Sequence, residues 1–105
     1  MAAYLIVTMT IHDPETYRKY TALTPATLAR YGGRFLTRGD EVSTIEGPAF
    51  TERLVLLEFP DRAAVMAWYH DADYQSAAAF RHAASTGRII LQEGRDNTAT
   101  PDPLV

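Results

Sequence analysis

The chain of 105 residues contains no cysteine and a single lysine, and each shortage excludes a class of function. Without cysteine there is no disulfide, no thiolate nucleophile and no cysteine-ligated zinc or iron–sulfur site. Thirteen acidic residues outnumber ten basic ones, for a formal net charge of −3, and no part of the sequence concentrates the basic residues. We therefore expect no nucleic acid partner and no attraction to an anionic membrane surface.

Long apolar stretches are also missing, and none approaches the length of a membrane-spanning helix. The first residues, MAAYLIVTMTIHD, carry neither a basic leader nor a cleavage site of small residues. We predict a cytoplasmic protein without a transmembrane segment. The composition, 47% hydrophobic and 22% charged, is typical of one folded domain, which we place at residues 1–94. Residues 95–105, rich in proline and without periodicity, are predicted to be a flexible tail.

The first strand and helix have clear signals. Residues 4–11 are apolar and then alternate, as in a central strand, and Asp13-Pro14 is typical of a helix N-cap and first helical position. One stripe of the helix that follows carries Tyr17, Tyr20, Thr24, Leu28 and Tyr31. Pro25 interrupts it and predicts a kink or a second short helix.

Residues 31–47, YGGRFLTRGDEVSTIEG, organise the middle of the chain. The glycine pair after Tyr31 is typical of a helix end, because glycine takes the left-handed conformation at little cost. From Arg34 onward the residues alternate as in a strand, with a turn at Gly39-Asp40. We expect a long strand bent into two parts.

The second half repeats the strand-to-helix pattern. Residues 53–59 form an apolar strand, Asp61 caps a helix over residues 62–69, and Asp73 is predicted to cap a further helix from Tyr74 to about Ser85. Gly87 is expected to end that helix and residues 88–93 to form the last strand.

This order predicts an α+β fold of the ferredoxin-like type, a β-α-β-β-α-β string that forms an antiparallel sheet with its helices on one face. Both central strands are apolar on both sides, so the other face also needs a cover. A second copy packed sheet to sheet provides it, which predicts a homodimer with a barrel-like core, a dimeric α/β-barrel.

Four segments carry a further signal: YLIVTMTIHDPETYRKY, YGGRFLTRGDEVSTIEG, ERLVLLEFPDRAAVMAWYHDADYQ and FRHAASTGRIILQEG. Together they resemble the family with the domain of unknown function DUF1330, within the dimeric α/β-barrel superfamily, as far as Gly94. The resemblance implies the ferredoxin-like fold and the homodimer. Because this superfamily includes cofactor-free monooxygenases, haem-binding enzymes, small isomerases and pure binding modules, it leaves the activity open.

Polar residues on interior faces are the candidates for a site. Tyr20 lies on the packing stripe of the first helix, where it is either a core tyrosine or a group that moves a proton in a pocket. Arg38 shares a strand face with Leu36 and needs a carboxylate if buried, for which we name Glu46 or Glu58. Such a pair is either structural or an anion clamp.

Arg81 is the most suggestive residue. It lies seven positions after Tyr74, at the border of the packing face of its helix, and Trp68 and Tyr69 lie on the helix before. These side chains predict a ligand-binding space with aromatic walls and a positive charge, suited to a small aromatic or carboxylated molecule. The alternative is a solvated arginine lying over a tyrosine.

The three histidines, His12, His70 and His82, include no pair with the i, i+4 spacing of a helical metal site, so we predict no metal. His12, at a strand end, is either a surface residue or a general base. There is no glycine-rich nucleotide motif and no G-x-S-x-G, so neither nucleotide use nor a nucleophile-elbow hydrolase has support. We expect no cofactor.

Two functions of different classes remain. One is a cofactor-independent enzyme, an isomerase, cyclase or oxygenase, with Tyr20 or His12 moving protons and Arg38 and Arg81 holding charge. The other is a non-catalytic homodimeric module that binds a small molecule or is purely structural. A haem-binding protein ranks third, since a histidine ligand lacks support from spacing.

Overall fold

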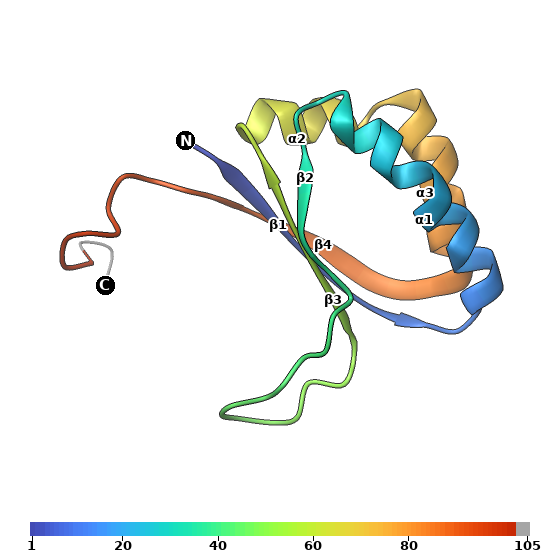
Figure 1. The fold of residues 1–105 in the computed structure, drawn as a ribbon, viewed down its shortest axis with the longest axis horizontal. Helices are drawn as coiled ribbons and strands as arrows, with labels where there is room; N and C mark the ends of the chain where they lie inside the picture. Colours follow the sequence, from blue (N-terminus) through green and yellow to red (C-terminus); the bar gives the residue numbers. More distant parts are fainter. Residues whose placement is uncertain (103–105) are drawn as a thin grey trace.

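The computed structural model describes residues 1–102, which form one antiparallel sheet with helices on one face (Figure 1). The elements follow in this order: β1 (Ala3–Ile11), α1 (Pro14–Ala29), β2 (Arg34–Arg38), β3 (Arg53–Phe59), α2 (Arg62–Tyr69), α3 (Ala72–Ala84) and β4 (Ser85–Glu93). The strand order β2-β3-β1-β4 places the first and third strands in the centre. This is the predicted ferredoxin-like arrangement, in which helical segments connect the strands across one face.

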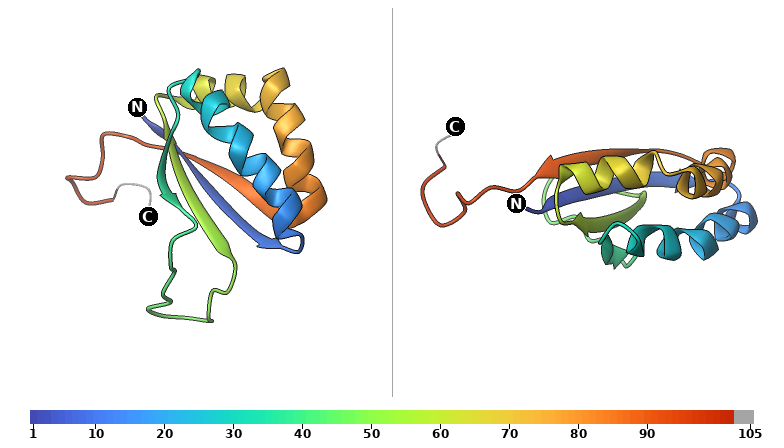
Figure 2. Two further views of the ribbon diagram at one scale, coloured as in Figure 1. Left: turned by 45° about the vertical axis from the view of Figure 1, so that its right-hand side comes forward. Right: turned by 90° about the horizontal axis from the view of Figure 1, so that it is seen from above.

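Side chains of the central strands alternate between the two faces of the sheet. Leu5 of β1 lies opposite Leu57 of β3 and Leu91 of β4, and it is buried under the helices. The next residue, Ile6, lies opposite Leu56 and Ile90 on the other face. The two views of Figure 2 show no helix on that face. Three strands therefore present a row of aliphatic side chains that the described chain does not cover, as the apolar strands predicted.

Two of the three predicted helix N-caps are present in the structure. The Asp13 carboxylate accepts a hydrogen bond from the Thr16 backbone nitrogen, and that of Asp61 accepts one from Ala64 at 2.8 Å. The third prediction, Asp73, is wrong: Asp71 caps α3 and accepts from the backbone nitrogens of Asp73 and Tyr74. An aspartate at either position has the same local chemistry, so the sequence does not separate them.

Pro25 lies inside α1 without ending it, so the predicted second short helix does not form. A proline in a helix removes the donor for the carbonyl four residues earlier, here that of Thr21. Arg38 of β2 supplies the missing donor, because its Nη2 lies 3.1 Å from the Thr21 carbonyl oxygen. The helix stays continuous to Ala29, and Gly32, with φ of +72°, then turns the chain.

The predicted two-part strand is also wrong, since only residues 34–38 pair with β3 and residues 39–52 form a loop that projects from the sheet (Figure 1). The neighbouring strand β3 begins at Arg53, so the loop has no strand beside it in this chain. A shift in register between Phe35 and Thr37 further changes the face of the residues that follow. Residues 95–102 contain no helix or strand, and the rest of the predicted tail, residues 103–105, lies outside the described residues.

Gly87 does not end α3 but lies inside β4, opposite Met9. A Cβ atom there would clash with the Thr8 carbonyl oxygen, and backbone cannot yield as a side chain can. We expect Gly87→Ala to lower the free energy of unfolding by about 1–3 kcal/mol in a urea titration. Thr86→Ala, at an exposed position of the same strand, is the matched control. Equal stability of both variants would show that β4 can move away from β1.

Among residues 1–102, no helix is long and apolar enough to cross a membrane.

Candidate functional site

Aromatic side chains from three helices form the layer between α1, α3 and the sheet. Trp68 of α2 packs on Tyr74 of α3, with ring centroids 3.9 Å apart, and on Phe59 at 5.3 Å. Tyr20 of α1 meets the edge of Tyr74, and their hydroxyl oxygens lie 3.1 Å apart. Since Trp68 and Tyr74 are almost fully buried, this cluster is a rigid wall for whatever lies beside it.

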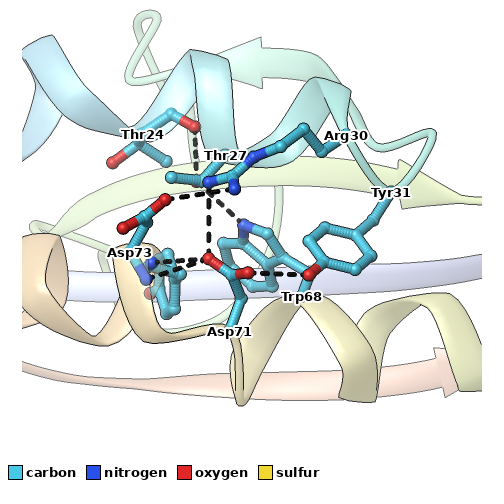
Figure 3. Close-up of polar contacts among 8 residues, drawn as sticks. Thr24, Thr27, Arg30, Tyr31, Trp68, Asp71 and Asp73 are labelled. Carbon is cyan, nitrogen blue, oxygen red and sulfur yellow. Dashed lines mark hydrogen bonds and ion pairs between the residues drawn. The ribbon is translucent and has the colours of Figure 1, made fainter.

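Polar contacts fix the wall from the side of α1 (Figure 3). The Trp68 indole nitrogen donates to the Thr27 hydroxyl at 3.2 Å, and that hydroxyl donates to the Thr24 carbonyl at 2.8 Å. Nearby, the Tyr31 hydroxyl donates to Asp71 at 2.7 Å, so the residue that caps α3 also ties it to the end of α1. These bonds hold the indole ring in one orientation.

Asp71 makes the stability of this arrangement depend on pH. The Tyr31 hydroxyl and the Tyr74 backbone N–H, both donating to its carboxylate, lower the pKa of Asp71. A carboxyl with a lowered folded pKa stabilises the fold above its unfolded pKa of about 4, and this is lost as pH falls through the folded value.

We therefore expect Asp71→Asn to be less stable than the native protein at pH 6 and to lose less stability on acidification to pH 3. Urea midpoints at both pH values measure this. Asp73→Asn, which removes an exposed carboxylate from the same helical turn, is the control. If Asp71→Asn loses as much stability between pH 6 and pH 3 as the native protein does, other carboxyl groups cause the loss. Asp13 is one such group, because the hydrogen bonds that it accepts from Thr16 lower its pKa.

Arg81 of α3 is a buried cation without an acidic partner. Only 8% of the residue is exposed, and its Nε atom is buried with no hydrogen-bond acceptor. Among residues 1–102, the carboxylates within ion-pair distance of an arginine belong to the pairs of Arg30 and Arg34, not to Arg81. Its guanidinium instead lies 5.8 Å from the Tyr20 ring centroid, with Nη2 3.0 Å from Nε2 of His82. A buried guanidinium in such surroundings retains donor capacity for an anion.

A cavity of about 540 Å³ opens beside Arg81, between edge strand β4 and helices α2 and α3. Trp68 and Tyr69, two of the candidate residues, form part of its wall together with apolar residues of β4. Arg88 and His82 also line it, and none of its described lining residues is acidic. The cavity is therefore electropositive, partly aromatic and large enough for a small organic ligand.

The two central tyrosines lie behind this cavity rather than in it. Burial strongly raises the pKa of Tyr20, and Tyr74 beside it raises it further. Burial also raises the pKa of Tyr74, although Tyr20 and Arg81 oppose this. Both hydroxyls thus keep their protons at neutral pH. Tyr20 lines a separate narrow cleft of about 30 Å³ under α1, which shares Trp68 with the larger cavity.

The other predicted site residues lie elsewhere. Arg38 is exposed and stacks on Phe35 at 4.4 Å, because the register shift places it opposite Val55 and not beside Leu36 as predicted. Neither predicted carboxylate partner reaches it: Glu58 pairs with Arg34 at 2.8 Å, and Glu46 is exposed in the loop. His12 is exposed at the end of β1 and lines none of the cavities described here.

Sequence reasoning missed two lining residues, His82 and Arg88. A histidine directly after Arg81 lies about 100° around the helix from it, so the pattern did not place both on one wall. In the structure the two side chains nevertheless meet, with Nη2 of Arg81 3.0 Å from Nε2 of His82. The described residues contain no group of three or more His, Asp or Glu able to hold a metal ion.

Comparison with models of known protein families identifies the family of this chain. The model of the domain of unknown function DUF1330 matches residues 2–95, nearly the whole chain. The chain belongs to the DUF1330 family. The resemblance first seen in four sequence segments is thereby confirmed.

Solved structures share the fold of this DUF1330 protein at low identity. RPA0582, a protein of unknown function from Rhodopseudomonas palustris, aligns with a TM-score of 0.76 and 19% identity over 90% of this chain and 83% of its own. A dimeric ferredoxin-like protein of unknown function from Jannaschia sp. CCS1 gives 0.69 and 15% over 90% and 100%. SnoaB, a cofactor-independent oxygenase from Streptomyces nogalater, gives 0.61 and 19% over 94% and 98%. No curated protein matches the chain.

Proposed function

We propose that this DUF1330 protein is a cytoplasmic homodimer that binds a small aromatic carboxylate in the Arg81 cavity and converts it without a cofactor. The observation that carries the proposal is the buried Arg81 guanidinium, whose Nε has no acceptor and which has no carboxylate partner among the described residues. A ligand carboxylate is the group that completes such a site, because it accepts from two guanidinium nitrogens at once.

The side chains that line the cavity favour a ligand with an aromatic ring. Trp68 and Tyr69 line the same cavity as Arg81, together with the apolar residues Ile89 and Leu91 of β4. A planar ring placed there contacts both walls while its carboxylate reaches the guanidinium. Tyr20 and Tyr74 support the arginine and the indole from behind.

The reaction class is that of an isomerase, cyclase or oxygenase acting through an enolate. Arg81 beside a developing enolate oxygen lowers the energy of its negative charge. His82 is the group suited to move the proton. Because a guanidinium only donates hydrogen bonds, Nε2 of His82 is the acceptor in its contact with Arg81. When a ligand carboxylate replaces His82 as the acceptor, Nε2 keeps a free lone pair that can take up a proton. SnoaB, with the same fold, is a cofactor-independent oxygenase, which supports chemistry without a bound group on this scaffold.

Titration with benzoate and with phenylpyruvate tests the binding step, and neutral benzamide is the matched control. We expect both carboxylates, at millimolar concentration, to raise the melting temperature by mass action, and benzamide to leave it unchanged. Equal shifts with benzamide, or no shift with either carboxylate, would contradict the proposal.

The alternative is a non-catalytic dimeric module that binds the same ligand, favoured by the two tyrosines keeping their protons. Exchange of the phenylpyruvate methylene protons into D₂O, followed by NMR, separates the two. An enzyme accelerates the exchange, and His82→Gln removes most of that acceleration while benzoate binding remains. Binding without any acceleration in the native protein would establish the module.

A further inference from the structure

We propose a second anion site in this protein, a phosphate-binding groove formed by Arg18, Arg38 and Arg53 on the opposite side of α1 from the Arg81 cavity. The groove measures about 330 Å³ and lies between the first half of α1 and the end of the sheet where β2 stops at Arg38 and β3 begins at Arg53. Its remaining lining residues are Ile11, Pro14, Tyr17 and Thr21. It shares none of its residues with the Arg81 cavity.

Two of the three guanidinium groups are held in place by groups that do not neutralise them. Arg38 donates from Nη2 to the Thr21 carbonyl and stacks on Phe35. Arg53 lies 5.6 Å from the Tyr17 ring centroid, and its Nη2 donates to the Arg38 carbonyl at 3.4 Å. Each keeps further N–H donors, and the Nε of Arg53 is buried with no acceptor.

Acidic residues near the groove are engaged elsewhere. The Asp13 carboxylate accepts from Thr16, and that of Asp40 accepts from the Arg38 backbone nitrogen at 3.0 Å. Within residues 1–102, neither they nor Glu52 form an ion pair with the three arginines. Three positive charges therefore face one small groove in a chain whose net charge is −3.

The number and shape of the donors indicate the ligand. Three charges at one place complement a dianion better than a single carboxylate, and the planar guanidinium matches the geometry of phosphate oxygens. The groove also presents the side chains of Ile11 and Tyr17, which can contact an apolar substituent. The group recognised is thus a phosphate dianion, either inorganic phosphate or the end of a small monoester.

Isothermal titration of the full chain with inorganic phosphate and with phenyl phosphate, at 150 mM NaCl, tests this. We expect one site per chain, with tighter binding of phenyl phosphate if a monoester is the natural ligand and of inorganic phosphate if it is not. Arg38→Gln is expected to weaken binding by about tenfold or more, because a charge-assisted hydrogen bond is lost.

Arg18→Gln tests the site without disturbing the fold, because the Arg18 side chain forms no hydrogen bond or ion pair among the described residues. We expect this variant to bind phosphate several-fold more weakly. Arg62→Gln, an exposed arginine of α2 outside the groove, should bind like the native protein.

Failure of both phosphates to bind below about 10 mM, or equal affinity in Arg18→Gln, Arg38→Gln and Arg62→Gln, would overturn the site. A change of oligomeric state in Arg18→Gln without a change in phosphate affinity would also overturn the site. The arginines would then contact the loop over residues 39–52 of a second copy, which contains four acidic residues. The site stands apart from the proposed function: Arg81→Met should leave phosphate affinity unchanged, and benzoate should not compete.

Discussion

Replacing Arg81 with methionine is expected to weaken benzoate binding by about 10- to 100-fold, because the charge-assisted hydrogen bonds to the carboxylate are lost. Methionine keeps an unbranched apolar side chain in the wall of the cavity, in place of the aliphatic part of the arginine. The loss of affinity is therefore attributable to the guanidinium rather than to a collapsed space. Isothermal titration of native protein and variant measures it.

The same variant should be as stable as the native protein or more stable. A buried cation without a carboxylate has lost water and gained little in return, and an apolar replacement of similar volume is often neutral or stabilising. The Arg81 side chain contacts His82 and lies over Tyr20, and neither group carries a compensating negative charge. We expect the free energy of unfolding to stay level or rise by about 1 kcal/mol.

A purely structural arginine predicts the reverse result. Its removal would lower the free energy of unfolding by about 1–3 kcal/mol and would leave the affinity for benzoate unchanged. Arg62→Met on the exposed side of α2 is the matched control and should change neither quantity. Retained affinity together with a clear loss of stability in Arg81→Met would contradict the proposed site.

Placing an aspartate at Ile6 is expected to convert the protein from dimer to monomer. Ile6 is the centre of a row across three strands, with Leu56 and Ile90 beside it, on the face without helices. Two such rows packed together would exclude water from both, whereas an unpaired carboxylate buried between them costs several kcal/mol. We expect the dimer to dissociate at least about 100-fold more readily.

Sedimentation velocity of native and variant protein near 10 μM gives the answer. Leu23→Asp, on the outer surface of α1, is the control and should remain a dimer, because Leu23 is already 47% exposed on the opposite side of the molecule. A native protein that sediments as a monomer would refute the dimer, as would an Ile6→Asp variant that still sediments as a dimer.

The parts of the fold that were predictable depend on neighbours in sequence. Two helices start at an aspartate, Asp13 and Asp61, whose carboxylate accepts a hydrogen bond from the backbone three positions later. The local sequence alone therefore identifies these helix starts. The choice of Asp71 over Asp73 depends on Tyr31, forty residues earlier, whose hydroxyl donates to it. The continuity of α1 through Pro25 likewise depends on Arg38 from another element.

The candidate site divides in the same way. Helical spacing was enough to place Arg81 at the border of the core and to bring Trp68 and Tyr69 near it. Arg38 was assigned to that site by assuming regular alternation along β2, and the shift in register between Phe35 and Thr37 moves it to another groove. An irregularity of one residue has no clear signal in a single sequence, because the alternation on either side remains intact.

The measurement closest to the central claim is the NMR signal of the Arg81 Nε–H in uniformly ¹⁵N-labelled protein, assigned by its disappearance in Arg81→Met. In the free protein this N–H has no acceptor among the described residues. Benzoate should shift the signal progressively and to saturation, whereas benzamide should leave it in place. A signal that does not respond to benzoate, or that responds equally to benzamide, would contradict the assignment of Arg81 as the carboxylate-binding group.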